Sequence, residues 1–414
     1  MVLNQLTITR PDDFHLHLRN GASLKAVLPF TMKQFGRALI MPNLSPPVTN
    51  IIEVWAYHRE IMDAFISEEV IFQPLMTIYL TDSTTPKDIE EVKRSGFVLA
   101  TKLYPVNATT NSAHGVTDIK KLAPVFEKMA EVGLILCIHG ETLVSEEFGD
   151  VTRNGQVGQL RRESVFIKET LSWIVETFPT LKVVLEHITT GEAVDFVINA
   201  REGVSATITA HHLLATLDDA LGSHHYKCMP VLKEENHRQV LLAAATSGNP
   251  RFFAGTDSAP HAKSKKETAC GCAGCFTALH AIELYATAFE EMGAIDNLEG
   301  FLSHFGADFY GLERNQKTLT IKREEWIIPT EVPFGEGEVL VPFWGGKTLS
   351  WKVDGKSCLF LMFTKHSKMK NNQNLYPHKG CRFLILKNSI KYYFYQYIYR
   401  IIIVKLSIHI FWSM

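Results

Sequence analysis

Short apolar runs alternate with amphipathic stretches from residue 14 to about residue 307 of the 414-residue chain. The apolar runs, which predict strands, lie at residues 14–18, 37–43, 72–80, 97–105, 134–140, 182–188, 204–210 and 251–257. The amphipathic stretches, which predict helices, lie near residues 51–66, 86–95, 117–132, 161–176, 191–200, 237–247, 276–292 and 296–307. Strands that are apolar along their whole length are typical of a parallel sheet covered by helices on both faces. Eight strand–helix units therefore predict an α/β fold, a (β/α)8 TIM barrel, with a doubly wound open sheet as the alternative.

Polar side chains stand at or just after the ends of these predicted strands. They are His15, His17, Asn43, Lys102, His139, His187 and Asp257. In a barrel, the C-terminal ends of the strands and the loops that follow them build the active site. Six strands that deliver polar groups to one rim predict an active site there.

The first strand carries two histidines, His15 and His17, on one face, because side chains alternate between faces in an extended segment. Their neighbours Phe14, Leu16 and Leu18 point the other way. Two adjacent imidazoles at a strand end suit metal coordination. The alternative is a half-exposed strand with incidental histidines.

Lys102 lies within an apolar strand, where an unpaired ammonium group is costly. One interpretation is a lysine whose stem reaches the barrel mouth and whose charge stays in water. The other is a neutral amine that reacts with CO₂ to give a carbamate. That anionic group could bridge two cations.

His139, His187 and Asp257 each have an ordinary explanation when taken singly. A lone histidine at a strand end is often a core residue with a hydrogen-bond partner, and a lone aspartate can cap a helix. Thr189 and Glu192, just after His187, fit a capping box that opens the next helix. Taken together with the histidine pair and the buried lysine, the three residues predict a two-metal site.

These residue types support metal-assisted hydrolysis. Two cations bridged by an anionic ligand lower the pKa of a shared water and polarise a carbonyl. Asp257 can take the proton from that water and return it to the leaving nitrogen. Arg19 and Asn43, on the same rim, would hold an anionic group of the substrate, and a bidentate arginine–carboxylate contact suits this role.

Two further segments near the predicted rim have two interpretations each. Cys270, Cys272 and Cys275 could form half of a zinc site, but no clear second half exists, so we favour a glycine-rich loop that brings backbone amides to the substrate. Residues 109–112 are either a plain polar turn or a lid whose Thr109 and Thr110 hydroxyls reach the reacting carbonyl. We assign no role to four other histidines, His211, His212, His224 and His225.

Composition fits an ordinary soluble enzyme, with 46% hydrophobic and 21% charged residues. The net charge of −2 hides an asymmetry, because ten of the 42 basic residues and none of the 44 acidic ones follow residue 355. Residues 1–355 therefore hold 32 basic and 44 acidic side chains. Such an acidic body argues against nucleic acid as the main partner.

The chain divides by composition near residue 355. Residues 1–355 are expected to form the catalytic domain, in which residues from about 308 add short strands and turns beside the barrel. Residues 356–414 are rich in Lys, Asn, Ile and Tyr, and we assign them no function. Charged side chains interrupt the apolar runs of this tail too often for a transmembrane helix.

Seven cysteines, three of them within six residues, do not make a secreted disulfide framework in a chain of this size. The N-terminus has neither an apolar signal core nor an Arg/Ser-rich presequence. We therefore expect a cytoplasmic protein, or a mitochondrial or plastid one if a presequence is missing from this chain.

Several motifs resemble dihydroorotases of the short, bacterial and plant type, within the amidohydrolase superfamily. The resemblance runs from about Leu6 to Trp351 and rests on RPDDFHLHLRNG, MPNLSPPVT, LMTIYLTD, TKLYPVNATTNS, HGE, LEHITT, GTDSAPHAKSKKE and CGCAGCF. Several of these motifs are specific to this enzyme family rather than to the superfamily. Residues 356–414 fall outside the resemblance.

The resemblance implies a (β/α)8 barrel with a binuclear zinc centre. Its ligands would be His15, His17, Lys102, His139, His187 and Asp257. The first two histidines and the aspartate would hold one zinc, and the other two histidines would hold the second. The lysine, carbamylated, would bridge both ions.

The resemblance also implies the reaction and the substrate contacts. The enzyme would reversibly cyclise N-carbamoyl-L-aspartate to L-dihydroorotate in pyrimidine synthesis, with Asp257 as the catalytic acid and base. Family members are usually homodimers that act on a small molecule, so we expect no nucleic-acid or membrane partner. The substrate would be held by Arg19, Asn43, His139 and His261 and by backbone groups of Met229 and Ala273.

Two segments depart from the family pattern. The segment from Thr142 to Arg162 is longer than expected, and residues 210–227 look shortened, with His211 where the pattern usually has Gln. These departures concern loop geometry and the Met229 contact. They leave the metal ligands intact.

The sequence leaves other functions as alternatives. Another cyclic-amide hydrolase or a deaminase of the superfamily would share the barrel, but deaminases usually use one metal and no bridging lysine, so Lys102 argues against them. The anion site of Arg19 and Asn43 argues against a neutral-ring substrate. A non-catalytic relative typically loses metal ligands, and all six are present here. A tail that prevents stable folding is a last alternative.

Overall fold

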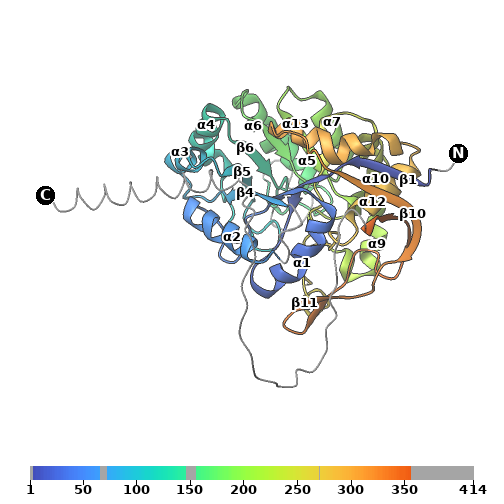
Figure 1. Ribbon diagram of the computed structural model, residues 1–414. Coiled ribbons are helices and arrows are strands. Elements are labelled where there is room, and N and C mark those ends of the chain that lie inside the picture. The colour runs from blue at the N-terminus through green and yellow to red at the C-terminus, as the bar shows by residue number, and fades with distance from the viewer. Residues whose placement is uncertain (1–2, 66–71, 146–154, 270, 356–414) are drawn as a thin grey trace, which may run out of the picture. The chain divides into compact units, whose positions relative to one another are not determined.

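The structure is a computed structural model that describes residues 3–65, 72–145, 155–269 and 271–355 (Figure 1). The composition-based tail at residues 356–414 lies outside the described residues, so the expected domain division stays a prediction. The long segment expected from Thr142 to Arg162 is described only in part.

Eight parallel strands form one sheet, in which each strand pairs with the next along the chain. The strands are β2 (Asp12–Leu16), β3 (Arg37–Ile40), β4 (Gln73–Tyr79), β5 (Val98–Leu103), β6 (Ile135–Ile138), β7 (Val183–Leu185), β8 (Val204–Ile208) and β9 (Phe252–Ala254). Seven lie within the predicted apolar runs, and β2 overlaps its run but begins two residues earlier. Their burial on both faces explains why the runs are continuous rather than alternating.

The sheet closes on itself between its first and last strands. The backbone N–H of His17 donates to Ser258 O over 3.0 Å, and that of Asp257 donates to His15 O over 2.8 Å. Asp13, buried beside this seam, accepts hydrogen bonds from the backbone of His15 and from Thr256. The barrel is confirmed, and the open-sheet alternative is wrong.

Helices follow the strands and cover the barrel. The predicted helices are found as α2 (Ile51–Asp63), α3 (Pro86–Arg94), α4 (Ala123–Val132), α5 (Arg162–Phe166) with α6 (Ser172–Thr177), α7 (Gly191–Asn199), α10 (Glu235–Thr246), α12 (Ala281–Glu291) and α13 (Phe305–Tyr310). Their ends follow local chemistry. In α3, Thr85 and Asp88 form a capping box around Pro86, and Lys93 and Arg94 occupy the last turn.

One predicted feature of the helices is wrong, and four helices were not predicted. Helix α1 (Gly21–Gln34) was not predicted, because it contains Pro29 and buries the polar Thr31 and Gln34 with its apolar residues. The buried face of this helix therefore differs little in polarity from its exposed face. The capping box expected at Thr189 is wrong, since the N-cap of α7 is Thr190, which accepts from Ala193 N. Three short helices, α8 (Ala210–Leu214), α9 (Leu217–Gly222) and α11 (Lys263–Lys266), were also missed.

The segment after the barrel adds antiparallel strands, as expected. β10 (Thr318–Ile327) pairs with β13 (Thr348–Val353) and with the unpredicted β1 (Gln5–Thr9), which lies beside β10 in Figure 1. β11 (Val332–Gly335) and β12 (Glu338–Leu340) form a separate hairpin. Trp351 of β13 is buried, which ties this sheet to the barrel domain.

The barrel interior has an apolar end and a polar end. Phe14, Leu75 and Ile135, near the starts of their strands, belong to one apolar cluster with Tyr310 of α13. The rings of Phe14 and Tyr310 stack at 4.8 Å between centroids. This cluster fills the N-terminal end and leaves the C-terminal ends of the strands to polar residues.

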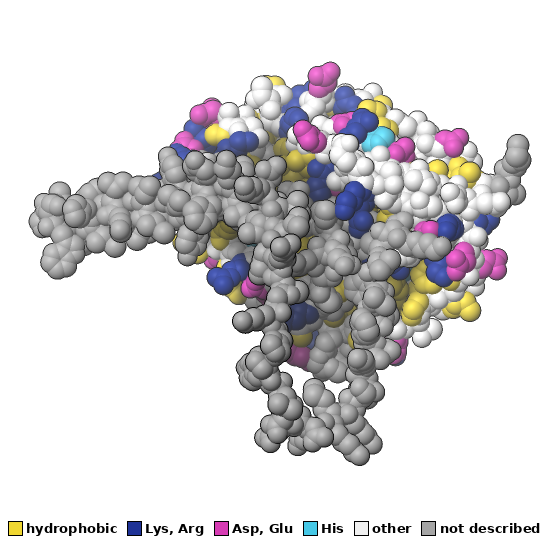
Figure 2. Space-filling view, viewed as in Figure 1, with side chains coloured by type: hydrophobic (Ala, Val, Ile, Leu, Met, Phe, Trp, Pro, Cys, Tyr) yellow, Lys and Arg dark blue, Asp and Glu magenta, His cyan; other side chains and the backbone are white. Residues whose placement is uncertain are grey.

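The surface carries charges of both signs. Basic and acidic side chains are interspersed over the described part of the face shown in Figure 2. This pattern differs from the basic stripe that is typical of nucleic-acid-binding proteins. Among the helices of the described residues, none combines the length and the apolar character needed to cross a bilayer.

Candidate active site

Six of the seven polar residues predicted at the strand ends line one cavity at the C-terminal end of the barrel, and the seventh, Lys102, is buried behind its wall. Its wall includes both histidines of the first strand, the histidines that follow β6 and β7, and the aspartate that follows β9. The full lining is His15, His17, Arg19, Asn43, Tyr104, Thr109, Thr110, His139, His187, Met229, Asp257, Ala259, Ala273 and Gly274.

His15, His17 and Asp257 form one compact group. Asp257 Oδ1 lies 3.1 Å from His17 Nε2 and 3.5 Å from His15 Nε2. One potential ligand atom from each of the three residues lies within 4.8 Å of the others. Both histidines are buried, so the alternative of a half-exposed strand with incidental histidines is wrong.

His139 and His187 continue the group around the rim. The ring centroid of His187 lies 4.8 Å from that of His139 and 4.9 Å from that of His15. Backbone conformation helps to aim these residues, because His187, Asp257 and Arg19 all have positive φ, at 40°, 43° and 62°. A left-handed conformation is costly for residues other than glycine and often marks functional sites.

A glycine before Asp257 gives the site its close packing. A Cβ atom at Gly255 would lie 2.8 Å from Thr207 Cβ and 2.9 Å from His15 Cβ. A larger residue would therefore push the last two strands and the first one apart. The sequence pattern did not reveal this requirement.

Lys102 is fully buried, with 0% of its surface exposed, so the alternative of a lysine reaching into water is wrong. Its Nζ has no hydrogen-bond partner among the described residues, and it lies 5.1 Å from the centroid of the Tyr104 ring. Burial lowers the pKa of Lys102 below its ordinary value. The side chain is thus driven towards the neutral amine, the form that can react with CO₂.

Other buried nitrogens near Lys102 also lack partners. Within the described part of the chain, His17 Nδ1 and His187 Nδ1 make no hydrogen bond. Buried polar atoms are normally paired, so several unpaired ones in a single cavity call for a bound group. Imidazoles, a carboxylate and an amine that can become a carbamate are donors that suit Zn²⁺. The donor set therefore fits bound cations.

The protonation states fit the same role. Burial lowers the pKa of His17 to about 4 and that of His187 well below its ordinary value, so both imidazoles are neutral at neutral pH. Burial opposes ionisation of Asp257. The hydrogen bond from His17 and the nearby imidazoles outweigh it and hold the pKa of this carboxyl below its ordinary value. Neutral imidazole and ionised carboxylate are the ligating forms.

Two buried glutamates support the histidines, and sequence reasoning gave them no role. Glu186 Oε2 lies 2.9 Å from His15 Nδ1, and Glu141 Oε2 lies 2.7 Å from His139 Nε2. Carboxylates that orient ligand histidines are a common outer layer of metal sites. A signal was present, because an acidic residue beside a histidine at an apolar strand end is itself unusual.

Five of the six predicted substrate residues line the cavity, and the sixth, His261, does not. Arg19 Nε donates to Pro260 O over 3.0 Å, and its Nη2 lies 3.0 Å from His261 Nε2. His261 does not line the cavity itself but holds the arginine that does. Burial lowers the pKa of His261 to about 2, so its ring is neutral.

The segment at residues 109–112 packs over this side. Thr110 Oγ1 lies 3.3 Å from both the nitrogen and the oxygen of the Ala273 backbone, and Asn43 Nδ2 donates to Thr110 O. These contacts join the expected lid segment to the glycine-rich segment after α11. Thr109 lies on the cavity wall beside it.

Lys266 shapes the glycine-rich segment and was missed from sequence. Its buried Nζ donates to the carbonyl oxygens of Lys227, Cys272 and Gly274 over 3.0, 3.1 and 2.6 Å. The expected backbone contact at Ala273 lies between two of these carbonyls. Cys275 is buried, Cys272 is partly exposed, and Cys270 lies outside the described residues.

Comparison with known proteins places this barrel in a family. In sequence the chain is 54% identical over 353 residues to a protein named dihydroorotase from Teredinibacter turnerae, a match that covers 84% of this chain and 99% of that protein. It is 53% identical over 353 residues to a dihydroorotase from Picosynechococcus sp., with the same coverage. The chain belongs to the dihydroorotase family. No family model matches it.

Solved structures agree with the membership in the dihydroorotase family. The crystal structure of dihydroorotase from Saccharomyces cerevisiae in complex with 5-fluoroorotic acid matches with a TM-score of 0.78 and 34% identity, over 85% of this chain and 98% of that one. Dihydroorotase from Campylobacter jejuni matches with a TM-score of 0.75 and 33% identity, over 86% and 98%. L-Hydantoinase from Arthrobacter aurescens, at 12% identity and a TM-score of 0.68, shares the fold alone. Dihydroorotases are metal-dependent hydrolases of a cyclic amide, and His15, His17 and Asp257 at the barrel mouth form a group suited to a metal.

Proposed function

We propose that this protein is a metal-dependent dihydroorotase that interconverts N-carbamoyl-L-aspartate and L-dihydroorotate in pyrimidine synthesis. Two observations carry the proposal. Four histidines and Asp257 line one cavity at the barrel mouth. The amine of Lys102 is fully buried without a hydrogen-bond partner among the described residues, close enough to Asp257 and His187 to interact with them electrostatically. Identity of 54% to dihydroorotases over 84% of the chain supports the same activity.

Two Zn²⁺ ions would be held at the barrel mouth. His15, His17 and Asp257 would hold one ion, and His139 and His187 would hold the other. Lys102 would bridge them as a carbamate: its neutral amine nitrogen attacks the carbon of CO₂, an N–C bond forms, and a proton leaves to solvent. Supplying this anion also removes the cost of an unpaired buried amine.

The bound ions would polarise the scissile carbonyl and lower the pKa of the attacking water. The residues of the protein would carry out the proton transfers. Asp257, ionised and within 3.5 Å of two imidazoles, takes the proton of the attacking water at its carboxylate. It then returns that proton to the departing ring nitrogen, and in the direction of ring closure the transfers reverse.

The open side of the cavity would bind the substrate. Arg19 would present its guanidinium to the carboxylate, and Asn43 would complete the anion site. His261, expected to contact the substrate, would instead act through Arg19, which it holds together with Pro260 O. His139 and backbone groups of Met229 and Ala273 would contact the ring. Thr109 and Thr110 would close over it and exclude water.

Assembly and location remain predictions. We expect a homodimer that acts on this small molecule in the cytoplasm. Sedimentation at micromolar protein concentration measures the assembly, and a monomer there contradicts the expectation.

The proposal is tested by metal-controlled hydrolysis with a matched substrate. The full-length chain is stripped of metal with a chelator and reloaded with Zn²⁺, and ring opening is followed for L-dihydroorotate and for dihydrouracil, the same ring without the carboxylate. We expect zinc to restore opening of dihydroorotate and dihydrouracil to react at least about tenfold more slowly, because it lacks the ion pair with Arg19. A folded, zinc-loaded protein that opens dihydrouracil as fast would favour another cyclic-amide hydrolase. No hydrolysis of either substrate would contradict the proposal.

A further inference from the structure

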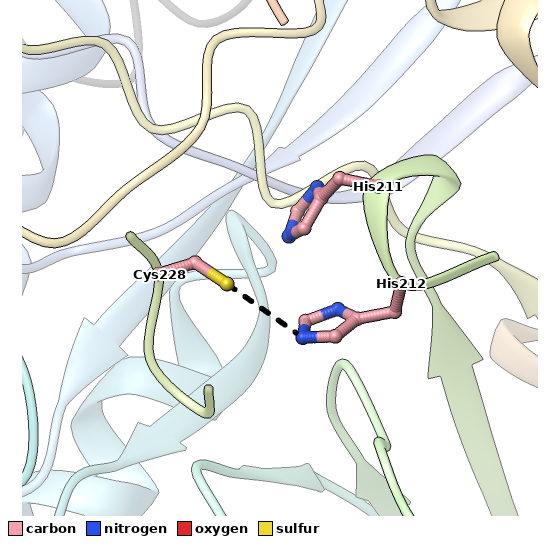
Figure 3. Close-up of side chains that lie close together, drawn as sticks. All are labelled: His211, His212 and Cys228. Atoms are coloured by element: carbon pink, nitrogen blue, oxygen red, sulfur yellow. Dashed lines mark hydrogen bonds between the residues drawn. The ribbon is translucent and has the colours of Figure 1, made fainter. Parts of the chain in front are cut away.

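A second cluster of metal-ligand side chains lies outside the active-site cavity. His211 and His212 come from α8, directly after β8, and Cys228 follows η4 (His224–Tyr226) (Figure 3). All three side chains are buried. One potential ligand atom from each lies within 4.8 Å of the others, and none of the three residues lines the active-site cavity.

His211 has an unmet bonding requirement. It is 0% exposed, and neither of its ring nitrogens has a hydrogen-bond partner among the described residues. Its neighbours include the ring of His212, 4.5 Å away between centroids, and the apolar ring of Phe343 at 6.2 Å. A buried imidazole without partners is costly, and a cation bound at one nitrogen would offset that cost.

His212 is oriented in the way that outer contacts orient metal ligands. Its Nδ1 lies 2.7 Å from Thr209 Oγ1, so Nδ1–H can donate a hydrogen bond to that oxygen. In this tautomer Nε2 carries no proton, and its lone pair is available to a metal. Nε2 lies 3.8 Å from Cys228 Sγ, as the dashed line in Figure 3 marks. In the other tautomer Nε2–H donates to Pro230 O over 3.1 Å.

We propose that His211, His212 and Cys228 form a third metal site of this protein, which takes Zn²⁺ or a similar divalent cation of borderline softness. Two imidazoles and one thiolate are a donor set that suits zinc rather than magnesium or calcium. Binding removes the proton of the Cys228 thiol to solvent, and the sulfur then donates to the ion. Burial lowers the pKa of His211 to about 4, so its ring is already neutral.

Residues around the cluster would supply a fourth metal ligand, and a surface cavity gives an ion access to it. Pro230 O lies 3.1 Å from His212 Nε2 and 3.3 Å from Cys228 Sγ, close to the spacing of about 3.5 Å that neighbouring ligands of a tetrahedral zinc adopt. A surface cavity of about 440 Å³ reaches Cys228 between Tyr226, Val231 and Leu232. An ion can therefore reach the cluster without passing through the active site.

The test uses Co²⁺ as the probe, because a thiolate bound to Co²⁺ gives a near-ultraviolet charge-transfer band. The donors proposed for the barrel centre include no sulfur, so this band reports a thiolate site separate from that centre. Apo full-length protein is titrated with Co²⁺ under reducing conditions, and bound metal is counted. We expect a thiolate band that saturates with one equivalent beyond those held by the barrel centre and that disappears when Zn²⁺ displaces Co²⁺.

Variants assign the ligands. Cys228→Ser should abolish the band and the extra equivalent, and His211→Gln should weaken binding of that equivalent by at least about tenfold. Cys272→Ser is the matched control and should keep both, since Cys272 belongs to the neighbouring glycine-rich segment. Absence of a thiolate band in the folded wild-type protein with excess Co²⁺ overturns the proposal. So does a band that survives in Cys228→Ser. Neither readout depends on dihydroorotase activity.

Discussion

Glu186 Oε2 lies 2.9 Å from His15 Nδ1 in the buried wall of the barrel mouth. The same oxygen accepts a hydrogen bond of 2.6 Å from Thr207, which in turn accepts one from the backbone N–H of His187. Burial opposes ionisation of Glu186, but the adjacent His15 and Lys102 outweigh it and hold the pKa of this carboxyl below its ordinary value. The ionised carboxylate favours the His15 tautomer that carries its proton on Nδ1. Nε2 is then left to face Asp257 and a metal.

Glu186→Gln should therefore weaken metal binding without removing a ligand. A glutamine presents either an amide oxygen or an NH₂ group to Nδ1 and does not hold one tautomer as a carboxylate does. We expect metal affinity to fall about ten- to a hundredfold, measured by competition with a chelator. Glu202→Gln, on the exposed surface, is the control and should bind metal as the wild type does. Unchanged affinity in Glu186→Gln would contradict the orienting role.

Arg19→Lys should damage substrate binding while the metals stay in place. The guanidinium bonds Pro260 O and His261 and keeps a planar fork towards the cavity, whereas a lysine offers a point charge. Loss of one charge-assisted hydrogen bond predicts that kcat/KM for dihydroorotate falls about ten- to a hundredfold, chiefly through KM. Arg59→Lys, on the exposed face of α2, is the matched control. Loss of metal with an unchanged KM would instead show that Arg19 supports the fold of the site.

The pH dependence of stability should carry a contribution from His280. This buried histidine lies 2.8 Å from Phe343 O through Nε2, and burial lowers its pKa to about 4 from an ordinary value of 6.5. Between those values the unfolded chain binds a proton that the folded chain does not, so stability is full above about pH 6.5 and falls as the pH drops towards 4. The loss approaches about 3 kcal/mol, at about 1.4 kcal/mol per unit of pKa shift.

His280→Gln should remove that contribution. Urea denaturation of wild type and variant between pH 4 and 7 gives the free energy of unfolding at each pH. The wild-type curve should fall more steeply with decreasing pH, by about 1.4 kcal/mol per pH unit, which is one proton. Parallel curves for the two proteins would show that His280 does not titrate between folded and unfolded states in this range.

The strands, and the polar residues at their ends that we propose as metal ligands, could be recognised from sequence because each depends on a local pattern. A buried parallel strand is a continuous apolar run, and a histidine, lysine or aspartate at its end stands out against that run. Helix α1 was not predicted because its buried face includes Thr31 and Gln34 and its interior includes Pro29. β1 was not predicted because its partner β10 lies more than 300 residues away, and pairing at that distance produces no pattern in the local sequence.

The missed site residues depend on contacts between distant segments. Lys266 bonds carbonyls at Lys227, Cys272 and Gly274, and only the folded chain brings them together. His211 received no role from sequence, yet folding places it beside Cys228. A lone histidine or cysteine in a sequence is ambiguous, since its chemistry depends on which residues become its neighbours.

Lys102→Ala tests most directly whether Lys102 joins two metals in a dihydroorotase centre. Metal content and L-dihydroorotate hydrolysis are measured for wild type, for Lys102→Ala and for Lys87→Ala, an exposed control. Lys102→Ala should lose metal and at least about a hundredfold of activity, since removal of a ligand should cost more than the loss of an outer contact. A small carboxylic acid should restore part of both, because it can occupy the place of the carbamate. Normal activity of Lys102→Ala without added carboxylic acid would contradict the account.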